Sequence, residues 1–275
     1  MHASGRWGNR GEGGAAVSAT AGSTRGPSRT GERRARVIVG LLVVLGSAGL
    51  ALLLFLLAPH HHRLTAAVDI ELAVTAQEFS MLLQRDWVLP AELPDFPRLR
   101  AHLIVDSLLL VPGYAGLLVF FTLGLANRIG WGGPWPHALA LPAVAAGLFD
   151  IVENGLTARA AEHLVSFGLS DAAVLDVRAA SLLKWWLVAL TCVLVGAMAT
   201  GLARRRDATD GRRWLLAGGL LLLACGLGLA LGCTWGTHWA GRPFPDAGAL
   251  LLVPGLASLV VWRLRPAPPH ALPAG

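Results

Sequence analysis

The chain has few charged residues and almost no lysine. Only 15% of its 275 residues are charged and 54% are hydrophobic, whereas soluble domains carry about 25% charge. This deficit excludes an ordinary water-soluble enzyme. Lys184 is the only lysine among 23 basic residues, and the arginines flank long apolar runs rather than forming a patch for nucleic acid. We therefore predict an integral membrane protein with no nucleic-acid partner.

Cysteine and the familiar catalytic motifs are also scarce. The three cysteines all lie in apolar stretches, which excludes a secreted scaffold held together by disulfides. The sequence contains no Walker A, GxSxG, HExxH or CxxC pattern. Composition and motifs therefore name no reaction, substrate or protein partner. The informative question is where polar groups lie within the apolar segments.

Six segments approach the length of about 20 apolar residues that crosses the ~30 Å hydrocarbon core of a bilayer. They are residues 37–58, 101–126, 137–156, 179–203, 214–235 and 247–262. The sixth is the shortest and contains Pro254. We predict an all-α integral membrane protein with a six-transmembrane-helix bundle, in which residues 101–265 form a five-helix unit after the first span.

The distribution of arginine predicts the orientation. With a cytoplasmic N-terminus, 15 arginines fall on the inner side of the membrane and seven on the outer side, as the positive-inside rule requires. Both termini should therefore be cytoplasmic, with residues 1–36 as a disordered basic tail and residues 266–275 as a short tail. The use of arginine in place of lysine, with abundant Ala, Gly and Leu, favours a high-GC bacterium. We expect the bacterial cytoplasmic (inner) membrane, with membrane lipid as a partner.

Residues 59–100 form the longest segment between spans and carry their own pattern. Apolar and polar residues alternate over residues 68–74, which predicts a half-buried strand. Thr75 and Glu78 have the spacing of a capping box, which predicts that a helix begins at Thr75. We expect a small extracytoplasmic strand-helix cap on the outer ends of the bundle. The triplet His60–His62 is interpreted as a solvated linker because no acidic or cysteine ligand spacing accompanies it.

Four ionisable residues interrupt the apolar spans. A charge at the centre of a bilayer costs at least ~2.5–3.5 kcal/mol on insertion scales, so each position requires an explanation. Asp106 lies six residues into the second span, Asp150 and Glu153 lie late in the third, and Lys184 lies six residues into the fourth. Because the second and fourth spans enter from outside and the third ends there, all four should lie at a similar depth. They are the candidate catalytic residues.

Other polar residues share the helix faces of these four. Asn154 lies on the same face as Asp150 and Glu153, His102 lies one turn outside Asp106, and Ser181 lies almost one turn outside Lys184. Pro112 and Gly113 can kink the second span. Tyr114, the only tyrosine, lies two turns deeper than Asp106 and on a different side of the helix, so its place in the cluster stays open. The candidate binding residues are Asn154, His102, Ser181 and Tyr114.

Three carboxylates against one ammonium would leave a net charge of minus two at low dielectric. Either one or two carboxyls are protonated, or a cation is bound, or the site opens to outer water. A divalent cation held by His102, Asp106, Asp150 and Glu153 would suit hydrolysis by metal-bound water, although the usual pair of histidines is absent. Without a metal, Asp150 or Glu153 could act as general base while Lys184 anchors a lipid phosphate.

The leading hypothesis is an outer-facing pocket in the membrane that binds a lipid headgroup or a small cation, with hydrolysis as one use of it. The second is a proton- or cation-coupled transporter, in which carboxyls relay protons. The third is a structural or assembly scaffold, in which the four groups form an ion-pair network between helices. Such interhelical polar bonds average only ~0.6 kcal/mol, which does not obviously offset the cost of inserting four ionisable groups.

Overall fold

The described residues form an all-helical bundle. The computed structural model describes residues 29–57, 66–87, 96–205, 210–235 and 243–265, and no strand occurs within these ranges. The elements are α1 (Arg29–Leu57), α2 (Ala66–Glu71), α3 (Ala76–Trp87), α4 (Pro97–Val105), the π-helical turn η2 (Asp106–Leu110), α5 (Val111–Ile129), α6 (Trp135–Ser166), α7 (Asp171–Arg205), α8 (Asp210–Trp235) and α9 (Pro243–Leu264).

Five helical segments of the described chain are long and apolar enough to cross a membrane. They are Thr30–Leu53, Pro97–Ile129, Trp135–Ser166, Asp171–Arg204 and Gly211–Cys233. Helix α9 contributes a shorter apolar stretch, Leu251–Leu264, at the position of the sixth and shortest predicted span. The chain is thus an all-α, multi-pass membrane protein, as predicted, while a sixth crossing stays a prediction.

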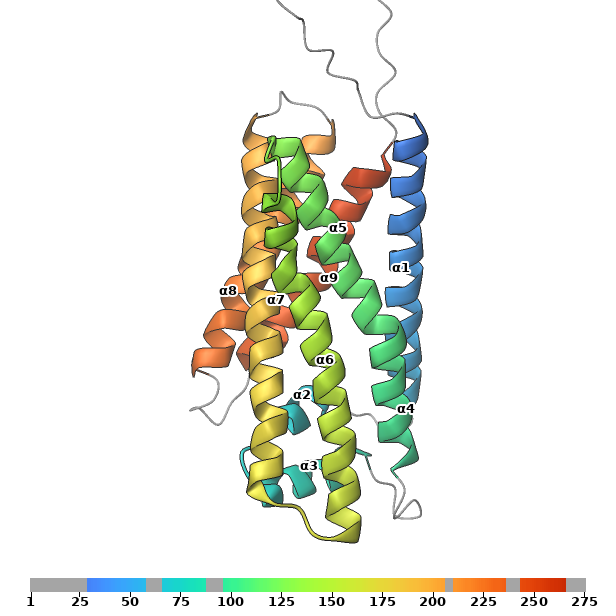
Figure 1. Ribbon diagram of the computed structural model, residues 1–275, viewed down its shortest axis with the longest axis vertical. Helices are drawn as coiled ribbons and strands as arrows, with labels where there is room; N and C mark the ends of the chain where they lie inside the picture. The colour runs from blue at the N-terminus through green and yellow to red at the C-terminus, as the bar shows by residue number, and fades with distance from the viewer. Residues whose placement is uncertain (1–28, 58–65, 88–95, 206–209, 236–242, 266–275) are drawn as a thin grey trace, which may run out of the picture.

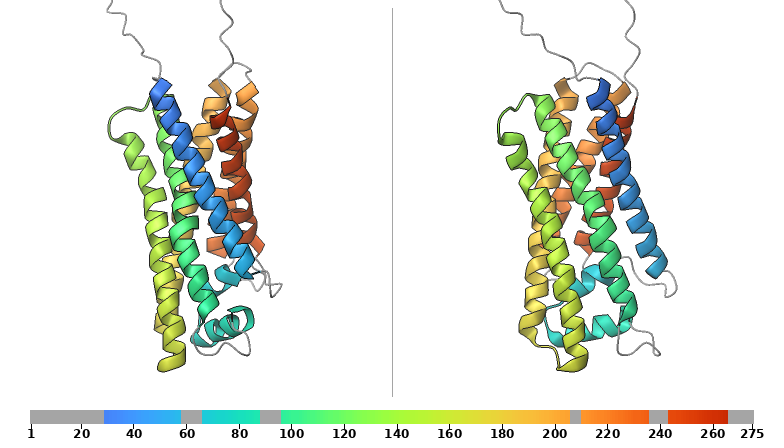
Figure 2. Two further views of the ribbon diagram at one scale, coloured as in Figure 1. Left: turned by 90° about the vertical axis from the view of Figure 1, so that its right-hand side faces the viewer. Right: turned by 45° about the vertical axis from the view of Figure 1, so that its right-hand side comes forward.

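The long helices alternate in direction (Figures 1 and 2). The two ends of the bundle can be told apart by the elements that lie there. Helix α1 begins and α9 finishes at the same end, which we call the terminal end. The short helices α2 and α3 lie at the opposite end, which we call the cap end. Both short helices thus lie at one end of the bundle, while the side of the membrane that they face stays a prediction.

Helices α6 and α7 extend past their predicted spans toward the cap end. The predicted loop between residues 157 and 178 is therefore mostly helical, and the connection narrows to a turn in which Gly168 adopts a φ of +84°. These extensions give α2, α3 and α4 an apolar surface on which to pack. The buried residues of this second core are Ile70, Ala73, Phe79, Leu83, Phe96, Leu99, Ala160, Ala161, Val174 and Val177.

The strand predicted over residues 68–74 is wrong, because residues 66–71 form helix α2. Ile70 and Ala73 are buried while Val74 is exposed, so burial follows a spacing of three residues rather than strict alternation. A strand also requires a neighbouring backbone to pair with, and none is present among the described residues, all of which belong to helices or their connections.

The predicted start of the next helix is confirmed. Helix α3 begins at Ala76, directly after Thr75. The Glu78 amide donates a hydrogen bond to Thr75 Oγ1 over 3.1 Å, and the Val74 amide donates to Glu78 Oε2 over 2.8 Å. The Ala76 amide donates to Asp171 Oδ1 over 2.7 Å, which fixes the start of α3 against the start of α7.

Helix α1 begins at Arg29, before the predicted span, so residues 29–36 are helical rather than disordered. An ion pair of 3.0 Å between Arg36 and Glu32, one turn apart, supports this extension. Large apolar side chains of α1 are exposed, as expected of a surface that faces lipid. The rest of the predicted tail (1–28), His60–His62 and residues 266–275 lie outside the described residues.

Helices α1 and α5 approach closely through glycine. A Cβ atom at Gly113 would lie 2.5 Å from Gly46 Cα, and one at Gly49 would lie 2.8 Å from the amide nitrogen of Leu110. Pro112 has no amide hydrogen, and the turn before it widens into η2, where the Val111 amide donates to the Asp106 carbonyl. The kink predicted at Pro112 therefore takes the form of a π-helical turn that carries Asp106.

Candidate functional site

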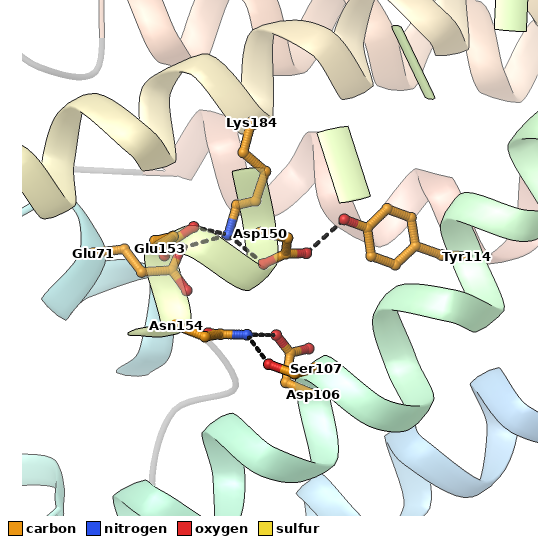
Figure 3. Close-up of polar contacts among 8 residues, drawn as sticks. All are labelled: Glu71, Asp106, Ser107, Tyr114, Asp150, Glu153, Asn154 and Lys184. Atoms are coloured by element: carbon orange, nitrogen blue, oxygen red, sulfur yellow. Dashed lines mark hydrogen bonds and ion pairs between the residues drawn. The ribbon is translucent and has the colours of Figure 1, made fainter. Parts of the chain in front are cut away.

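Lys184 is the centre of a buried ionic cluster between three helices (Figure 3). Its Nζ lies 3.1 Å from Glu71 Oε2 on α2, 3.2 Å from Asp150 Oδ1 on α6 and 2.5 Å from Glu153 Oε2 on α6. The Lys184 side chain is 5% exposed. We call Glu71, Asp150, Glu153 and Lys184 the Lys184 cluster.

The ammonium group of Lys184 has its full complement of partners. An ammonium has three N–H donors and no acceptor, and three carboxylate oxygens lie within 3.2 Å of Nζ. The same nitrogen lies 4.8 Å from the centroid of the Trp185 ring, within the range of a cation–π contact. An anionic ligand would therefore have to displace a carboxylate in order to bind Lys184.

Tyr114 extends the cluster toward the middle of the bundle. Its hydroxyl donates a hydrogen bond of 2.5 Å to Asp150 Oδ2, while Oδ1 of the same carboxylate faces Lys184 (Figure 3). The sequence left the place of Tyr114 open because its helical angle differs from that of Asp106. The phenol nevertheless reaches the cluster, because Asp150 approaches it from the neighbouring helix α6.

Asn154 links α6 to the π-helical turn. Its Nδ2 donates to Asp106 Oδ2 over 2.8 Å and to Ser107 Oγ over 3.0 Å, which uses both hydrogens of the amide (Figure 3). Consecutive residues of a regular α-helix point about 100° apart, so contact of both Asp106 and Ser107 with one amide fits the altered geometry of η2. Asp106 thus lies beside the Lys184 cluster through Asn154 rather than in direct contact with Lys184.

The two remaining candidate binding residues, His102 and Ser181, are also buried. His102 lies on α4, one turn before Asp106, and Ser181 lies on α7, almost one turn before Lys184. Three buried oxygens near the Lys184–Glu153 pair have no hydrogen-bond partner within the described part of the chain. They are Glu153 Oε1, Thr157 Oγ1 and Ser181 Oγ.

The charge of the site exceeds the value expected from the sequence. Glu71 adds a fourth carboxyl to Asp106, Asp150 and Glu153, against the single ammonium of Lys184. If all four carboxyls were ionised, the formal charge would be minus three. Like charges held together at low dielectric repel strongly, and each buried ion also loses its hydration. The cluster therefore favours any process that brings in positive charge.

The arrangement does not gather the four proposed metal ligands around one point. Among the residues that the structure describes, no three His, Cys, Asp or Glu side chains are grouped so that they could hold a metal ion. The space between Asp150 and Glu153 is taken by the ammonium of Lys184. The geometry thus favours the lysine as the cation of this site over a divalent metal.

Glu71 and Ser107 are the residues that the sequence did not identify as part of the site. Glu71 is 113 residues from Lys184 and follows an apolar residue in a segment that resembles a strand. Only the packing of α2 on the ends of α6 and α7 brings it to the cluster. Ser107 could be recognised only by anticipating the π-helical turn before Pro112. Comparison with protein-family models, curated proteins and solved structures gives no match for this chain.

Proposed function

We propose that this multi-pass membrane protein binds and releases protons at the Lys184 cluster. The observation that carries the proposal is the set of three carboxylates around one buried ammonium, with Asp106 as a fourth acid nearby. Protons are the smallest cations that can reduce this charge, and carboxyl groups accept them directly. Intramembrane acids commonly serve in this way.

The same geometry makes a lipid phosphate a poorer ligand than a cation. Lys184 would be the anchor for such an anion, but its three N–H donors already face Glu71, Asp150 and Glu153. A phosphate would enter a region of excess negative charge and break at least one of these ion pairs. A hydrolytic role for Asp150 would likewise require its carboxylate to leave Tyr114 or Lys184.

Access to the cluster is proposed from the cap end. Contacts run from Tyr114 through Asp150 and Lys184 to Glu71 on α2, and α2 lies at the cap end (Figures 1 and 3). Toward the terminal end, Thr191 is the next residue of α7 after Lys184 that carries a hydroxyl, and this hydroxyl donates to the Leu187 carbonyl of its own helix. This arrangement supports proton exchange from one side.

We propose that the cap end lies outside the cytoplasm, and the distribution of arginine supports this orientation. Helix α1 begins and helix α9 finishes at the terminal end (Figures 1 and 2). The predicted inner arginines that the structure describes lie near the starts of α1 and α8 and near the ends of α5, α7 and α9. Arg128 lies over the ring of Trp262 at 4.5 Å and Arg265 over that of Trp214 at 5.5 Å. Tryptophan is enriched at the interface between membrane and water, and arginine is in excess on its cytoplasmic side. The proposal therefore keeps both termini cytoplasmic and α2 and α3 extracytoplasmic.

Proton uptake by the purified protein tests the proposal. Acid is added stepwise across the neutral pH range, and the protons bound per chain are compared between the wild type and Asp150→Asn/Glu153→Gln. We expect fewer protons bound by this variant. Glu162→Gln is the matched control, because Glu162 is exposed and pairs with Arg100 outside the Lys184 cluster. Equal uptake by wild type and double variant would contradict the proposal.

A proton-coupled transporter is the second candidate function. It is favoured by the row of contacts from Tyr114 to Glu71, which offers successive proton acceptors. Uptake of a substrate into proteoliposomes that is driven by a pH gradient and abolished by Asp150→Asn would establish it. Proton binding without any such uptake would leave the proposed function standing and exclude the coupling.

A further inference from the structure

We infer a binding site for a small monovalent cation of the Na⁺ class between α6 and α7, formed by Glu153, Thr157 and Ser181. It deepens the proposed function, because it rests on the same excess of negative charge around Lys184. It differs from proton binding in that the ion is coordinated by oxygens of both helices.

Three buried oxygens carry the inference. Glu153 and Ser181 are 0% exposed and Thr157 is 2% exposed. The Glu153 Oε1, Thr157 Oγ1 and Ser181 Oγ atoms have no hydrogen-bond partner among the described residues. Buried polar atoms are satisfied in nearly all folded proteins, because an unsatisfied one has lost its hydration without a replacement. The described residues therefore leave these oxygens available to a ligand.

Helical geometry brings the two hydroxyls to a similar level, about one turn from Glu153. Thr157 lies one turn beyond Glu153 on α6, and Ser181 lies almost one turn before Lys184 on α7, so each shares the face of its neighbour. Helices α6 and α7 run in opposite directions (Figure 1), and the Lys184–Glu153 ion pair fixes their register. Both hydroxyls are consequently displaced from this ion pair in the same direction, toward the cap end.

The chemistry of these ligands favours a monovalent hard cation. Carboxylate and hydroxyl oxygens suit hard cations, whereas Ca²⁺ takes six to eight oxygens, usually with several carboxylates. Here one oxygen of a single carboxylate is joined by two neutral hydroxyls, and Glu153 Oε2 is already paired with Lys184. Water molecules can supply the remaining ligands. A water molecule alone would satisfy the three oxygens but would leave the charge excess unchanged.

Thermal unfolding of the full-length protein in NaCl tests the site against choline chloride at equal ionic strength. A Na⁺ concentration ten times the Kd should raise the apparent Tm by about 3–6 °C. Thr157→Val/Ser181→Ala should remove this shift while keeping the Glu153 carboxyl. The matched control is Thr122→Val/Ser258→Ala, because both hydroxyls are buried and bond to backbone carbonyls of their own helices. It should keep the full shift.

The outcomes separate this inference from the proposed function. A Tm that responds equally to NaCl and choline chloride in the wild type would overturn the Na⁺ site, and normal proton uptake in the same preparation would leave the proton site intact. A Na⁺ shift that survives in Thr157→Val/Ser181→Ala would also overturn the assignment to these residues. Loss of proton uptake in the wild type, with the Na⁺ shift retained, would instead contradict the proposed function alone.

Discussion

Glu71, on a short helix at the cap end, forms an ion pair of 3.1 Å with Lys184 of the long helix α7. This contact joins a segment outside the apolar spans to a residue inside one. The Arg178 guanidinium donates to the Leu72 carbonyl over 3.3 Å and so holds the next residue of the same segment. The position of α2 is therefore tied to the ionic state of the cluster.

Glu71→Gln should loosen the cap end without unfolding the bundle. A hydrogen bond to a charged group contributes about 1.5–3 kcal/mol, so amide hydrogen exchange in α2 and α3 should accelerate about ten- to hundredfold. Lys184 keeps Asp150 and Glu153, so the global Tm should change little. Glu162→Gln is the control, because Glu162 forms an exposed ion pair with Arg100. Unchanged exchange in α2 would show that Glu71 does not hold the cap end.

Removal of the only ammonium should be far more costly than removal of one acid. Lys184→Met leaves three carboxylates without their shared partner, and such a loss costs about 3–5 kcal/mol in buried pairs. Unfolding in mixed micelles measures the difference. Arg100→Met should cost only about 0–1 kcal/mol, because its ion pair with Glu162 is exposed. Equal losses for the two variants would mean that the cluster is not effectively buried.

Neutral amides should rescue the loss of Lys184. Adding Asp150→Asn and Glu153→Gln to Lys184→Met removes two of the uncompensated charges, so the triple variant should regain much of the lost stability.

Replacement of the same three residues also separates a structural role from proton binding. Under the scaffold hypothesis, replacing Asp150, Glu153 and Lys184 together with apolar residues would preserve cellular function. Under the proposed function, the variant with three apolar replacements would be stable, but its cellular function would be lost.

The close approach of α1 and α5 predicts a strong difference between two glycines of one helix. Gly113→Ala would place a Cβ 2.5 Å from Gly46 Cα, and overpacking of this kind costs about 1–3 kcal/mol. Gly124→Ala meets no atom within 4 Å and should be neutral or slightly stabilising, because alanine favours helix by about 1 kcal/mol over glycine. Thermal unfolding compares the two. Equal behaviour would exclude the tight contact beside η2.

The orientation can be tested with single introduced cysteines, because Cys192, Cys225 and Cys233 are buried free thiols. Ser170 is exposed in the connection between α6 and α7, and Gly132 is exposed in the connection between α5 and α6. A maleimide that cannot cross membranes should label Ser170→Cys in intact bacterial cells and Gly132→Cys only after lysis. The reverse pattern would place α2 and α3 in the cytoplasm.

The long helices could be predicted from sequence because their signal is local. An apolar run of sufficient length can satisfy its backbone in a membrane only as a helix or in a closed barrel, and the first five predicted spans each overlap one of the five helices long and apolar enough to cross a membrane. The helix ends were less predictable. Residues 157–166 and 171–178 are polar enough to resemble a loop, yet they form helix because α2 and α3 pack on them.

The convergence of Asp150, Glu153 and Lys184 followed from depth and topology, since charged residues in adjacent apolar helices can lower their energy by pairing. The positions of Glu71 and Ser107 depended on tertiary packing and on an irregular turn. Residues 68–74 were misjudged because alternation over so few residues cannot distinguish a strand from a short amphipathic helix. The pairing of Tyr114 with Asp150 also required knowledge of how α6 packs against α5.

Infrared spectroscopy of protonated carboxyl groups at neutral pH, in a detergent without carbonyl groups, tests the central claim most directly. The account predicts a carboxylic acid band in the wild type that shifts in D₂O and weakens in Glu153→Gln or Asp150→Asn. Glu162→Gln should leave the band unchanged, because the exposed Glu162 carboxylate is paired with Arg100. The absence of this band in the wild type would mean that every carboxyl of the Lys184 cluster is ionised, which would contradict a proton-binding site.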